Sequence, residues 1–299
     1  MAGYLLEAEP RLEVRLYTTL DNADDVLANY RAAVDAGAIA VVGPLTRHAV
    51  TALAQSDFVS VATLALNLPE SAVPAHATLY YFPLATESEA RQIARRMAAL
   101  GKRTAATIAS ANPLSKRNQA AFHDEWIKLG GTVAAELGFA ADPGKLANIR
   151  EQLQKSVPDA VFLALDAQQA RLVRPYIDPG IAVFATSLVH AEKPGPQRYL
   201  DLEGVRFYDM PWLLDRTRND LARYPREDAS YSFELRRLYA FGMDAARLVQ
   251  KILMNPANLN QPIAGASGEL KLDAERQFQR TPLEAQFIAG EVVLIESTP

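Results

Sequence analysis

Apolar, strand-like runs alternate with helix-like segments along most of this chain, and no other sequence feature limits its fold as strongly. The runs "AIAVVGPL" (38–45), "RTAATIAS" (103–110) and "DAVFLAL" (159–165) are each followed by residues with helical spacing. Strands that are apolar on both faces belong to parallel sheets, whose strands can be joined only through crossover segments. The order therefore predicts an α/β protein with mainly parallel sheets flanked by helices.

Three further segments each predict a particular type of secondary structure. Residues 11–19, "RLEVRLYTT", alternate like a strand, and residues 265–295 have the alternation and turn residues of antiparallel hairpins. Thr86 and Glu89 have the spacing of a capping box, which predicts the start of the helix in "TESEARQIARRMAALG" (86–101). We therefore expect two α/β units followed by an antiparallel C-terminal hairpin region.

The composition and net charge exclude several classes of binding partner and of structure. A chain of 299 residues with 49% hydrophobic residues can bury two cores. Its formal net charge of −4, with scattered basic residues, predicts no nucleic-acid partner. No apolar stretch reaches the roughly 18 residues of a membrane span, and residues 1–10 lack the features of a secretory signal. The absence of cysteine excludes disulfides and thiolate metal sites, and it leaves the compartment open.

The search for catalytic and cofactor motifs finds none. The four histidines, His48, His76, His123 and His190, show no metal-ligand spacing, and neither G-x-G-x-x-G nor a phosphate-binding lysine loop occurs. Ser267 in "GASGE" precedes a strand of the hairpin region, so we interpret it as a turn residue and not as a nucleophile. We predict no metal, no cofactor and no enzymatic activity, which favours binding.

Two positions keep more than one interpretation. The turn after residues 38–42 leaves backbone N–H groups free at the next helix, so Gly43 and Thr46 could cradle an anion, or Thr46 could simply cap that helix. Asp209 is flanked by aromatic residues in "FYDMPW", which predicts a raised pKa or a buried hydrogen bond. It could equally cap a turn before Pro211.

Several longer segments together resemble one family. They are "AVVGPLTRHAVTALA" (40–54), "TESEARQIARR" (86–96), "DLEGVRFYDMPWLL" (201–214) and "ASGELKLDAERQFQR" (266–280). In this order they resemble the C-terminal domain of the bacterial lipoprotein activators of penicillin-binding proteins, the LpoA or LppC type. These are similar to type I periplasmic binding proteins of the Leu/Ile/Val-binding kind. The resemblance covers nearly the whole chain.

The resemblance implies a fold with two lobes. Residues 1–84 and about 212–258 would form lobe 1, and residues 85–211 and about 259–299 would form lobe 2. It also implies a non-enzymatic periplasmic activator that regulates peptidoglycan synthesis by contacting a class A penicillin-binding protein. The full-length family is anchored in the outer membrane, but this chain has no cysteine for lipid attachment. The alternatives are a solute-binding receptor for an amino acid or similar ligand of an ABC transporter, and a sugar- or nucleotide-processing enzyme.

The chain departs from the family pattern in two places. Family members resemble one another in beginning this domain with an apolar strand and a turn, whereas Met1 falls near the end of the following helix, so we expect the first strand to be lacking. "SANPLSKR" (110–117) lacks the aromatic residue and glycine that relatives have there, which puts ligand contacts in doubt. If a small molecule binds between the lobes, strand ends would supply its contacts. The candidates are Gly43, Thr46, Asn67, Ser110, Asn112, Thr186, Ser187 and Asp209.

Overall fold

The computed structural model describes two compact units. It covers residues 13–20, 22–192, 198–215, 217–218, 220–222, 224, 226, 230–254 and 256–295, so residues 1–10, searched above for a signal, lie outside it. Unit 1 comprises Met1–Leu84, Arg216–Ser230 and Leu235–Thr281. Unit 2 comprises Ala85–Asp215, Tyr231–Glu234 and Pro282–Pro299.

A parallel sheet of three strands, in the order β1-β2-β3, organises the first part of unit 1. Helix α2 starts where Asn22 accepts the N–H of Asp25 at 2.9 Å, and the Tyr30 hydroxyl lies 2.9 Å from that of Thr63 on β2. The helix is thereby fixed to the sheet through a buried polar contact. The elements are α2 (Ala23–Asp35), β1 (Ala40–Val42), α3 (Arg47–Ala54), β2 (Ala62–Ala65) and β3 (Leu79–Tyr81).

The C-terminal part of unit 1 adds a long helix and a small antiparallel sheet in the order β11-β10-β9. The Phe82 ring stacks on Phe241 of α9 at 4.5 Å, and Tyr80 stacks on Phe278 of β11 at 6.1 Å. Helix, hairpin and parallel sheet therefore share one core. The elements are α9 (Phe233–Met254), η4 (Pro256–Asn258), β9 (Ile263–Ala264), β10 (Glu269–Leu272) and β11 (Phe278–Thr281).

This arrangement differs from the predicted lobes at three places. Residues 259–281 group with unit 1, whereas we expected them in lobe 2, and residues 212–215 and 231–234, expected in lobe 1, group with unit 2. The physical reason for the first difference is burial, because Ile263, Leu270 and Phe278 complete the apolar core around α9. A hairpin pattern in the sequence does not say which core its apolar face will cover.

The predicted strand at residues 11–19 is wrong for its described part. Residues 13–20 form no strand, and Leu16 is 82% exposed. Strand propensity and alternation were both present, but a strand exists only when a neighbour pairs with its N–H and C=O groups. The three strands of the parallel sheet do not include such a neighbour for this segment.

A buried carboxylate fixes the turn between β9 and β10 to α9. Asp244 accepts the N–H of Ala266 at 2.8 Å, and its other oxygen accepts the N–H of Ser267 at 2.7 Å and the Ser267 hydroxyl at 2.6 Å. The side chain of Asp244 is fully buried. Ser267 is thus a turn residue, as predicted from its place before the hairpin.

We expect the contribution of Asp244 to the free energy of unfolding to fall as the pH rises above 3.8. Burial raises the pKa of this carboxyl above its ordinary value of 3.8, against the hydrogen bonds from Ser267 and Ala266 that lower it. Between the unfolded and folded pKa values the folded state binds more protons, so each rise in pH favours unfolding. Denaturant titrations of wild type and Asp244→Asn at several pH values measure this slope by difference. If the unfolding free energies of the two proteins changed with pH in the same way, this expectation would be wrong.

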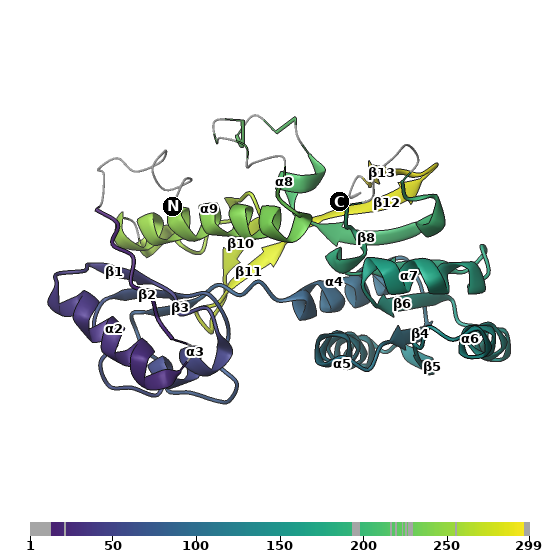
Figure 1. The fold of residues 1–299 in the computed structure, drawn as a ribbon, viewed down its shortest axis with the longest axis horizontal. Helices are drawn as coiled ribbons and strands as arrows, with labels where there is room; N and C mark the ends of the chain where they lie inside the picture. Colours follow the sequence, from purple (N-terminus) through teal and green to yellow (C-terminus); the bar gives the residue numbers. More distant parts are fainter. Residues whose placement is uncertain are drawn as a thin grey trace. The chain divides into compact units, whose positions relative to one another are not determined.

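The sheet of unit 2 has seven strands in the order β13-β12-β8-β7-β6-β4-β5. It is parallel from β8 to β5, and β12 and β13 continue it antiparallel, drawn in yellow beside β8 in Figure 1. The strands are β4 (Thr104–Ala109), β5 (Thr132–Gly138), β6 (Ala160–Ala164), β7 (Ala182–Ala185), β8 (Val205–Asp209), β12 (Leu283–Ile288) and β13 (Glu291–Leu294).

Helices cover both faces of this sheet, as the apolar pattern predicts. One core joins Ile93 of α4 and Phe122 of α5 to Phe162 of β6, and the other joins Leu153 of α6 and Val173 of α7 to Leu163 of β6. Strand β6 is buried at every position. The helices are α4 (Thr86–Ala99), α5 (Pro113–Lys128), α6 (Pro143–Ser156), α7 (Ala167–Val173) and α8 (Pro211–Leu214), with η1 (Arg174–Tyr176), η2 (Ser187–Val189) and η3 (Leu200–Leu202).

Replacing Val157 by glycine should stabilise unit 2 by about 1 kcal/mol. Val157 follows α6 in the left-handed region, with φ 42° and ψ 59°, and 74% of it is exposed. A β-branched residue is strained there, whereas glycine is favoured at this end of a helix and little burial is lost. Thermal unfolding would measure the gain. Val157→Ala keeps the Cβ atom, so a similar gain in that variant would refute the explanation.

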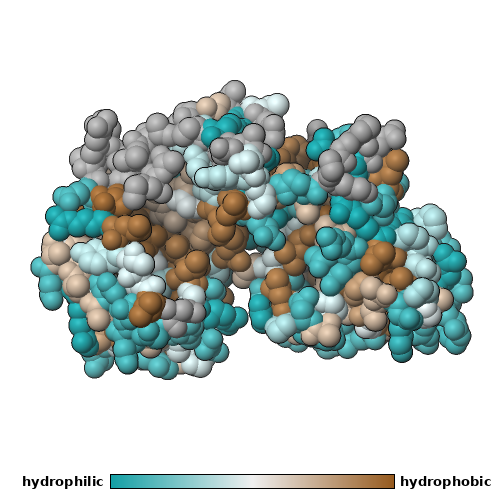
Figure 2. Space-filling view, viewed as in Figure 1, coloured by the Kyte–Doolittle hydropathy of each residue, from teal (hydrophilic) through white to brown (hydrophobic). Residues whose placement is uncertain are grey.

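Apolar side chains remain at the surface of unit 1. Brown, apolar patches interrupt the teal surface over the region of β1 and β2 in Figure 2. Ile39 and Leu45, which flank β1, are both exposed, as is Val42 within it. Among the described residues, we find no helix with the length and apolar character of a bilayer span.

Candidate functional site

The eight predicted site residues fall into two groups. Those of unit 1 follow β1 and β2, and those of unit 2 follow β4 and β7 or end β8. Unit 1 holds Gly43, Thr46 and Asn67, and unit 2 holds Ser110, Asn112, Thr186, Ser187 and Asp209.

The turn after β1 is held by its own hydrogen bonds. Gly43 has φ 115°, a left-handed value that favours glycine, and its N–H donates to the Leu64 carbonyl at 2.9 Å. Asn67 donates from Nδ2 to the Leu45 carbonyl at 2.9 Å, and its Oδ1 accepts the N–H of Leu68 at 2.9 Å. Asn67 therefore uses both ends of its carboxamide to brace the turn.

Thr46 does not cap α3 in the predicted way. It occupies the N-cap position with extended backbone angles, but its side chain makes no capping hydrogen bond. The local sequence places a suitable oxygen there, but a residue type favoured at the N-cap does not by itself guarantee the hydrogen bond. The prediction of a side-chain cap at Thr46 was wrong.

Ser110 and Asn112 form hydrogen bonds at the N-terminus of α5, just after the carboxyl end of β4. Asn112 Oδ1 accepts the N–H of Ser115 at 2.7 Å, and Asn112 Nδ2 donates to Ser110 Oγ at 2.7 Å. The Ser110 N–H donates to Ser115 Oγ at 2.8 Å, and that hydroxyl donates to the Ala164 carbonyl at the end of β6. These polar groups form hydrogen bonds with one another and with the Ala164 carbonyl, which favours a structural role.

Asp209 ends β8 in a buried pair with His190. The two side chains meet at 2.7 Å between Oδ2 and Nδ1, and Asp209 Oδ1 accepts the N–H of Met210 at 2.8 Å. The His190 ring packs edge-on against Phe233 at 4.6 Å. The interpretation of Asp209 as a buried hydrogen-bonding acid is thus correct. Its histidine partner was missed, because no local spacing links residues 190 and 209.

Glu89 is a second buried acid at this edge of the sheet. It is 3% exposed, and its Oε2 accepts the N–H of Ser187 at 2.8 Å. The predicted capping box is therefore wrong: α4 begins at Thr86, whose hydroxyl donates to Asn118 Oδ1 at 2.9 Å. Helical spacing with the buried Ile93 and Met97 places Glu89 on the apolar face, a signal that could have identified it.

Thr186→Val should leave stability unchanged or raise it by up to about 1 kcal/mol. Thr186 is fully buried, and among the described residues its hydroxyl finds no hydrogen-bond partner. Valine keeps the shape and removes an unsatisfied group. The matched control is Thr107→Val, which should destabilise, because the buried Thr107 hydroxyl accepts Gln119 Nε2 at 2.8 Å. Denaturant unfolding of both variants compares them, and equal losses would contradict this account.

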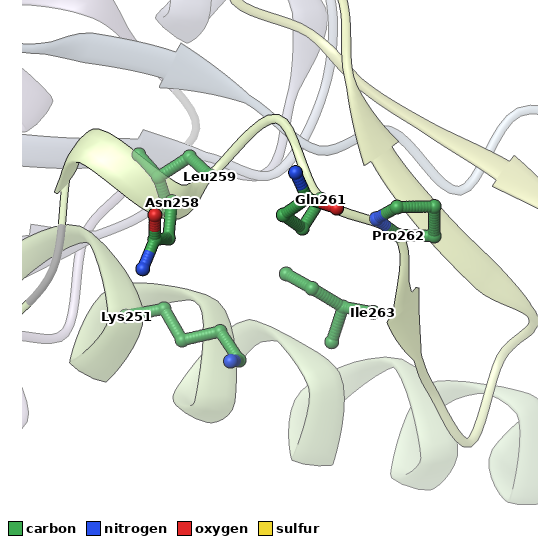
Figure 3. Close-up of a pocket in the computed structure, with 6 residues that line it drawn as sticks. All are labelled: Lys251, Asn258, Leu259, Gln261, Pro262 and Ile263. Carbon is green, nitrogen blue, oxygen red and sulfur yellow. The ribbon is translucent and has the colours of Figure 1, made fainter.

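A separate surface pocket of about 290 Å³ lies on unit 1, beside α9 (Figure 3). Lys251 contributes an ammonium group, and the buried Leu259 and Ile263 contribute an apolar floor. None of the eight predicted residues lines it. The lining residues are Lys251, Asn258, Leu259, Gln261, Pro262 and Ile263.

The chemistry available at the strand ends of unit 2 is therefore limited. The carboxylates of Glu89 and Asp209 are both held by donors of the protein, the Ser110 hydroxyl accepts Asn112 Nδ2, and the Ser115 hydroxyl donates to the Ala164 carbonyl. In the part of the chain that the structure describes, no group of three histidine, aspartate or glutamate residues is arranged to hold a metal ion. These hydrogen bonds hold the neighbouring helices and turns in place.

The sequence matches one protein family over most of its length. The model of the family described as "LppC putative lipoprotein" matches residues 7–290. The penicillin-binding protein activator LpoA of Edwardsiella piscicida is 29% identical over 330 residues, which cover 96% of this chain and 47% of that protein. LpoA of Edwardsiella ictaluri is 30% identical over 304 residues, covering 87% and 44%. The chain thus spans about half the length of the curated relatives it matches.

Solved structures confirm the predicted α/β fold class of type I periplasmic binding proteins. The LpoA C-domain of Haemophilus influenzae, described as a regulator of PBP1A, superimposes with a TM-score of 0.81 at 24% identity, covering 99% of this chain and 93% of that one. A Chromobacterium violaceum protein, described as a "putative branched-chain amino acid ABC transporter", gives a TM-score of 0.80 at 33% identity, covering 95% and 91%. The first of these likenesses concerns the fold alone.

Proposed function

The chain belongs to the LppC family of lipoproteins, and from this premise we propose that it acts in activating a class A penicillin-binding protein. In this proposal it regulates peptidoglycan synthesis by protein contact and makes or breaks no bond itself. The observation that carries the proposal is the family match over residues 7–290, together with curated relatives that are named penicillin-binding protein activators.

The side chains at the strand ends support a role without catalysis. A nucleophile needs a base within hydrogen-bond reach and a position open to substrate. Ser115 instead donates to the Ala164 carbonyl, and His190 is engaged by Asp209. Among the described residues, both polar clusters of unit 2 thus brace helices and loops. An activator needs such a rigid scaffold and no reactive group.

The proposal includes a location and leaves a place for a ligand. Membership of a lipoprotein family supports action in the periplasm, at the outer membrane. If a small molecule binds, Thr186 is one predicted residue with hydrogen-bonding capacity to spare, since its buried hydroxyl has no partner in the described part of the chain. Ser110, Asn112, Asn67 and Asp209 would first have to give up bonds that they already make.

A glycan-synthesis assay with the purified class A penicillin-binding protein of the same organism tests the proposal. We expect this chain to bind the enzyme in a pull-down and to raise its rate of glycan-strand synthesis. A protein of similar size and charge from outside the family serves as the control. Absence of both binding and stimulation would overturn the proposal.

A solute receptor is the second candidate, and one observation favours it. The Chromobacterium violaceum protein that is 33% identical carries the description of an amino acid transporter component. A receptor would gain stability from saturating ligand, about 2.7 kcal/mol at a hundred times its Kd. We expect no shift in thermal unfolding with leucine, isoleucine or valine. A rise of several degrees would favour the receptor over the activator.

A further inference from the structure

The pocket beside α9 on unit 1 has a floor that the core of the unit holds in place. Leu259 and Ile263 are buried, and they pack in one apolar cluster with Phe278 of β11. Figure 3 shows the Ile263 side chain facing the open space from β9. A floor fixed by core packing needs little reorganisation to receive a ligand, so this pocket is preformed.

Hydrogen bonds also fix the segment 258–264 that forms the wall of the pocket. The N–H of Gln261 donates to the Asn258 carbonyl at 3.2 Å, which closes the turn before β9. Arg247 Nη1 donates to the Ala264 carbonyl at 2.9 Å, and β9 pairs with β10 on its other side. The wall is therefore tied both to α9 and to the antiparallel sheet.

Lys251 supplies the only charge among the six residues that line the pocket. It lies one turn after Arg247 on α9, and in Figure 3 its side chain extends along the helix beside the opening. Among the described residues, its ammonium group makes no hydrogen bond or ion pair. A lysine in the last turn also stabilises the end of its helix, but this longer-range attraction leaves its N–H donors available.

The carboxamides of Asn258 and Gln261 add neutral donors and acceptors to the pocket. Within the described part of the chain, neither side chain makes a hydrogen bond. Each carboxamide carries a carbonyl oxygen and an NH₂ group, which complement the N–H and C=O of a peptide group. The polar side of the pocket thus suits a carboxylate with an amide beside it.

The lining also excludes other classes of ligand. No acidic residue lines the pocket, so the ammonium group of a free amino acid would find no counter-charge beside Lys251. Inorganic phosphate could meet the lysine but would gain nothing from the apolar floor. The volume of about 290 Å³ lies at the lower end for ligand pockets, which limits the ligand to about one or two residues.

We propose that this pocket binds the carboxyl-terminal residue of a peptide when that residue is aliphatic. Lys251 receives the carboxylate, Asn258 and Gln261 receive the peptide group, and Leu259 and Ile263 contact the aliphatic side chain. The proposal does not rest on the proposed function, and the pocket contains none of the eight residues predicted for the strand ends.

Titrations of the whole isotope-labelled protein, followed by the NMR shifts of its backbone amides, test the pocket. The probe is N-acetyl-leucine, which combines a carboxylate, a peptide group and an aliphatic side chain. We expect it to shift the amides of Leu259, Gln261 and Ile263, with a Kd on the order of 1 mM. N-acetyl-leucine amide lacks the charge and free leucine adds an ammonium group, so each should bind about tenfold more weakly or worse.

Two lysine variants separate a specific contact from general electrostatic attraction. Lys251→Gln should weaken the binding of N-acetyl-leucine about tenfold and leave the binding of its amide unchanged. The matched control, Lys128→Gln on α5, removes the same charge from an exposed lysine of unit 2 and should alter neither. Both lysines are exposed, so we expect unchanged thermal unfolding in both variants.

Several outcomes would overturn the proposal. Equal binding of N-acetyl-leucine and its amide would do so, as would unchanged binding by a folded Lys251→Gln variant. Free leucine or inorganic phosphate that bound as tightly as N-acetyl-leucine would contradict the proposed class of ligand. Shifts at Thr46 or Thr186 in place of the pocket would assign the ligand to the strand ends instead.

Discussion

Asp244→Ala is expected to lower the free energy of unfolding of unit 1 by about 3 kcal/mol. The carboxylate accepts the N–H groups of Ala266 and Ser267 and the Ser267 hydroxyl, all in a fully buried place. Alanine leaves these donors without an acceptor and opens a cavity between α9 and the turn. Denaturant unfolding followed by far-ultraviolet circular dichroism measures the loss.

Two controls define what Asp244 contributes. Ser267→Ala removes one of the three hydrogen bonds and should cost about 1 kcal/mol. Glu275→Ala removes an exposed acid of the same unit and should change stability by less than about 0.5 kcal/mol. Gly265 is part of the same buried turn, since a Cβ there would lie 2.6 Å from Asp244 Oδ2. If Asp244→Ala proved no worse than Glu275→Ala, the carboxylate would not be what holds this turn.

Gly131→Ala is expected to destabilise unit 2 by about 3 kcal/mol. A Cβ at this position would lie 2.1 Å from Cε2 of Trp126. The indole cannot move aside easily, because it is fully buried, stacks on Phe122 at 5.9 Å and donates from Nε1 to the Thr132 carbonyl at 3.0 Å. Thermal unfolding and the near-ultraviolet dichroism of the tryptophans report the change.

Gly138 and Trp126 provide the comparisons. A Cβ at Gly138 meets no atom within 4 Å, so Gly138→Ala should be nearly neutral. Trp126→Phe removes the atoms that clash, so the double variant Trp126→Phe with Gly131→Ala should lose less than the sum of the two single losses. Additive losses, or a stable Gly131→Ala variant, would show that the close approach does not control packing here.

The sequence predicted the secondary structure best where apolar residues recur at a regular spacing. The apolar runs at 103–110 and 159–165 became β4 and β6, buried at nearly every position, and the turn residues after 265 became hairpins. Periodicity reports burial directly, because each apolar side chain must find a core whichever way the chain is wound. Family membership was also accessible, since the motifs at 40–54 and 201–214 lie within the matched region.

Predictions failed where a residue depends on a partner distant in sequence. Glu89 has capping spacing with Thr86, yet it bonds to Ser187, 98 residues away. His190 and Asp209 become a pair only because η2 and β8 adjoin. Local spacing lists the bonds that a side chain can make, and tertiary packing selects among them.

The sequence by itself determined the α/β class, the order of its elements and the family, because hydrophobic periodicity and turn chemistry act over a few residues. Tertiary structure alone decided that residues 259–281 complete the core of unit 1, that the strand-like segment 13–20 pairs with none of the described strands and that Asp244 is buried against a turn. Each of these outcomes depends on which distant surfaces are available to cover an apolar face or accept a hydrogen bond. Such availability is a property of the assembled fold.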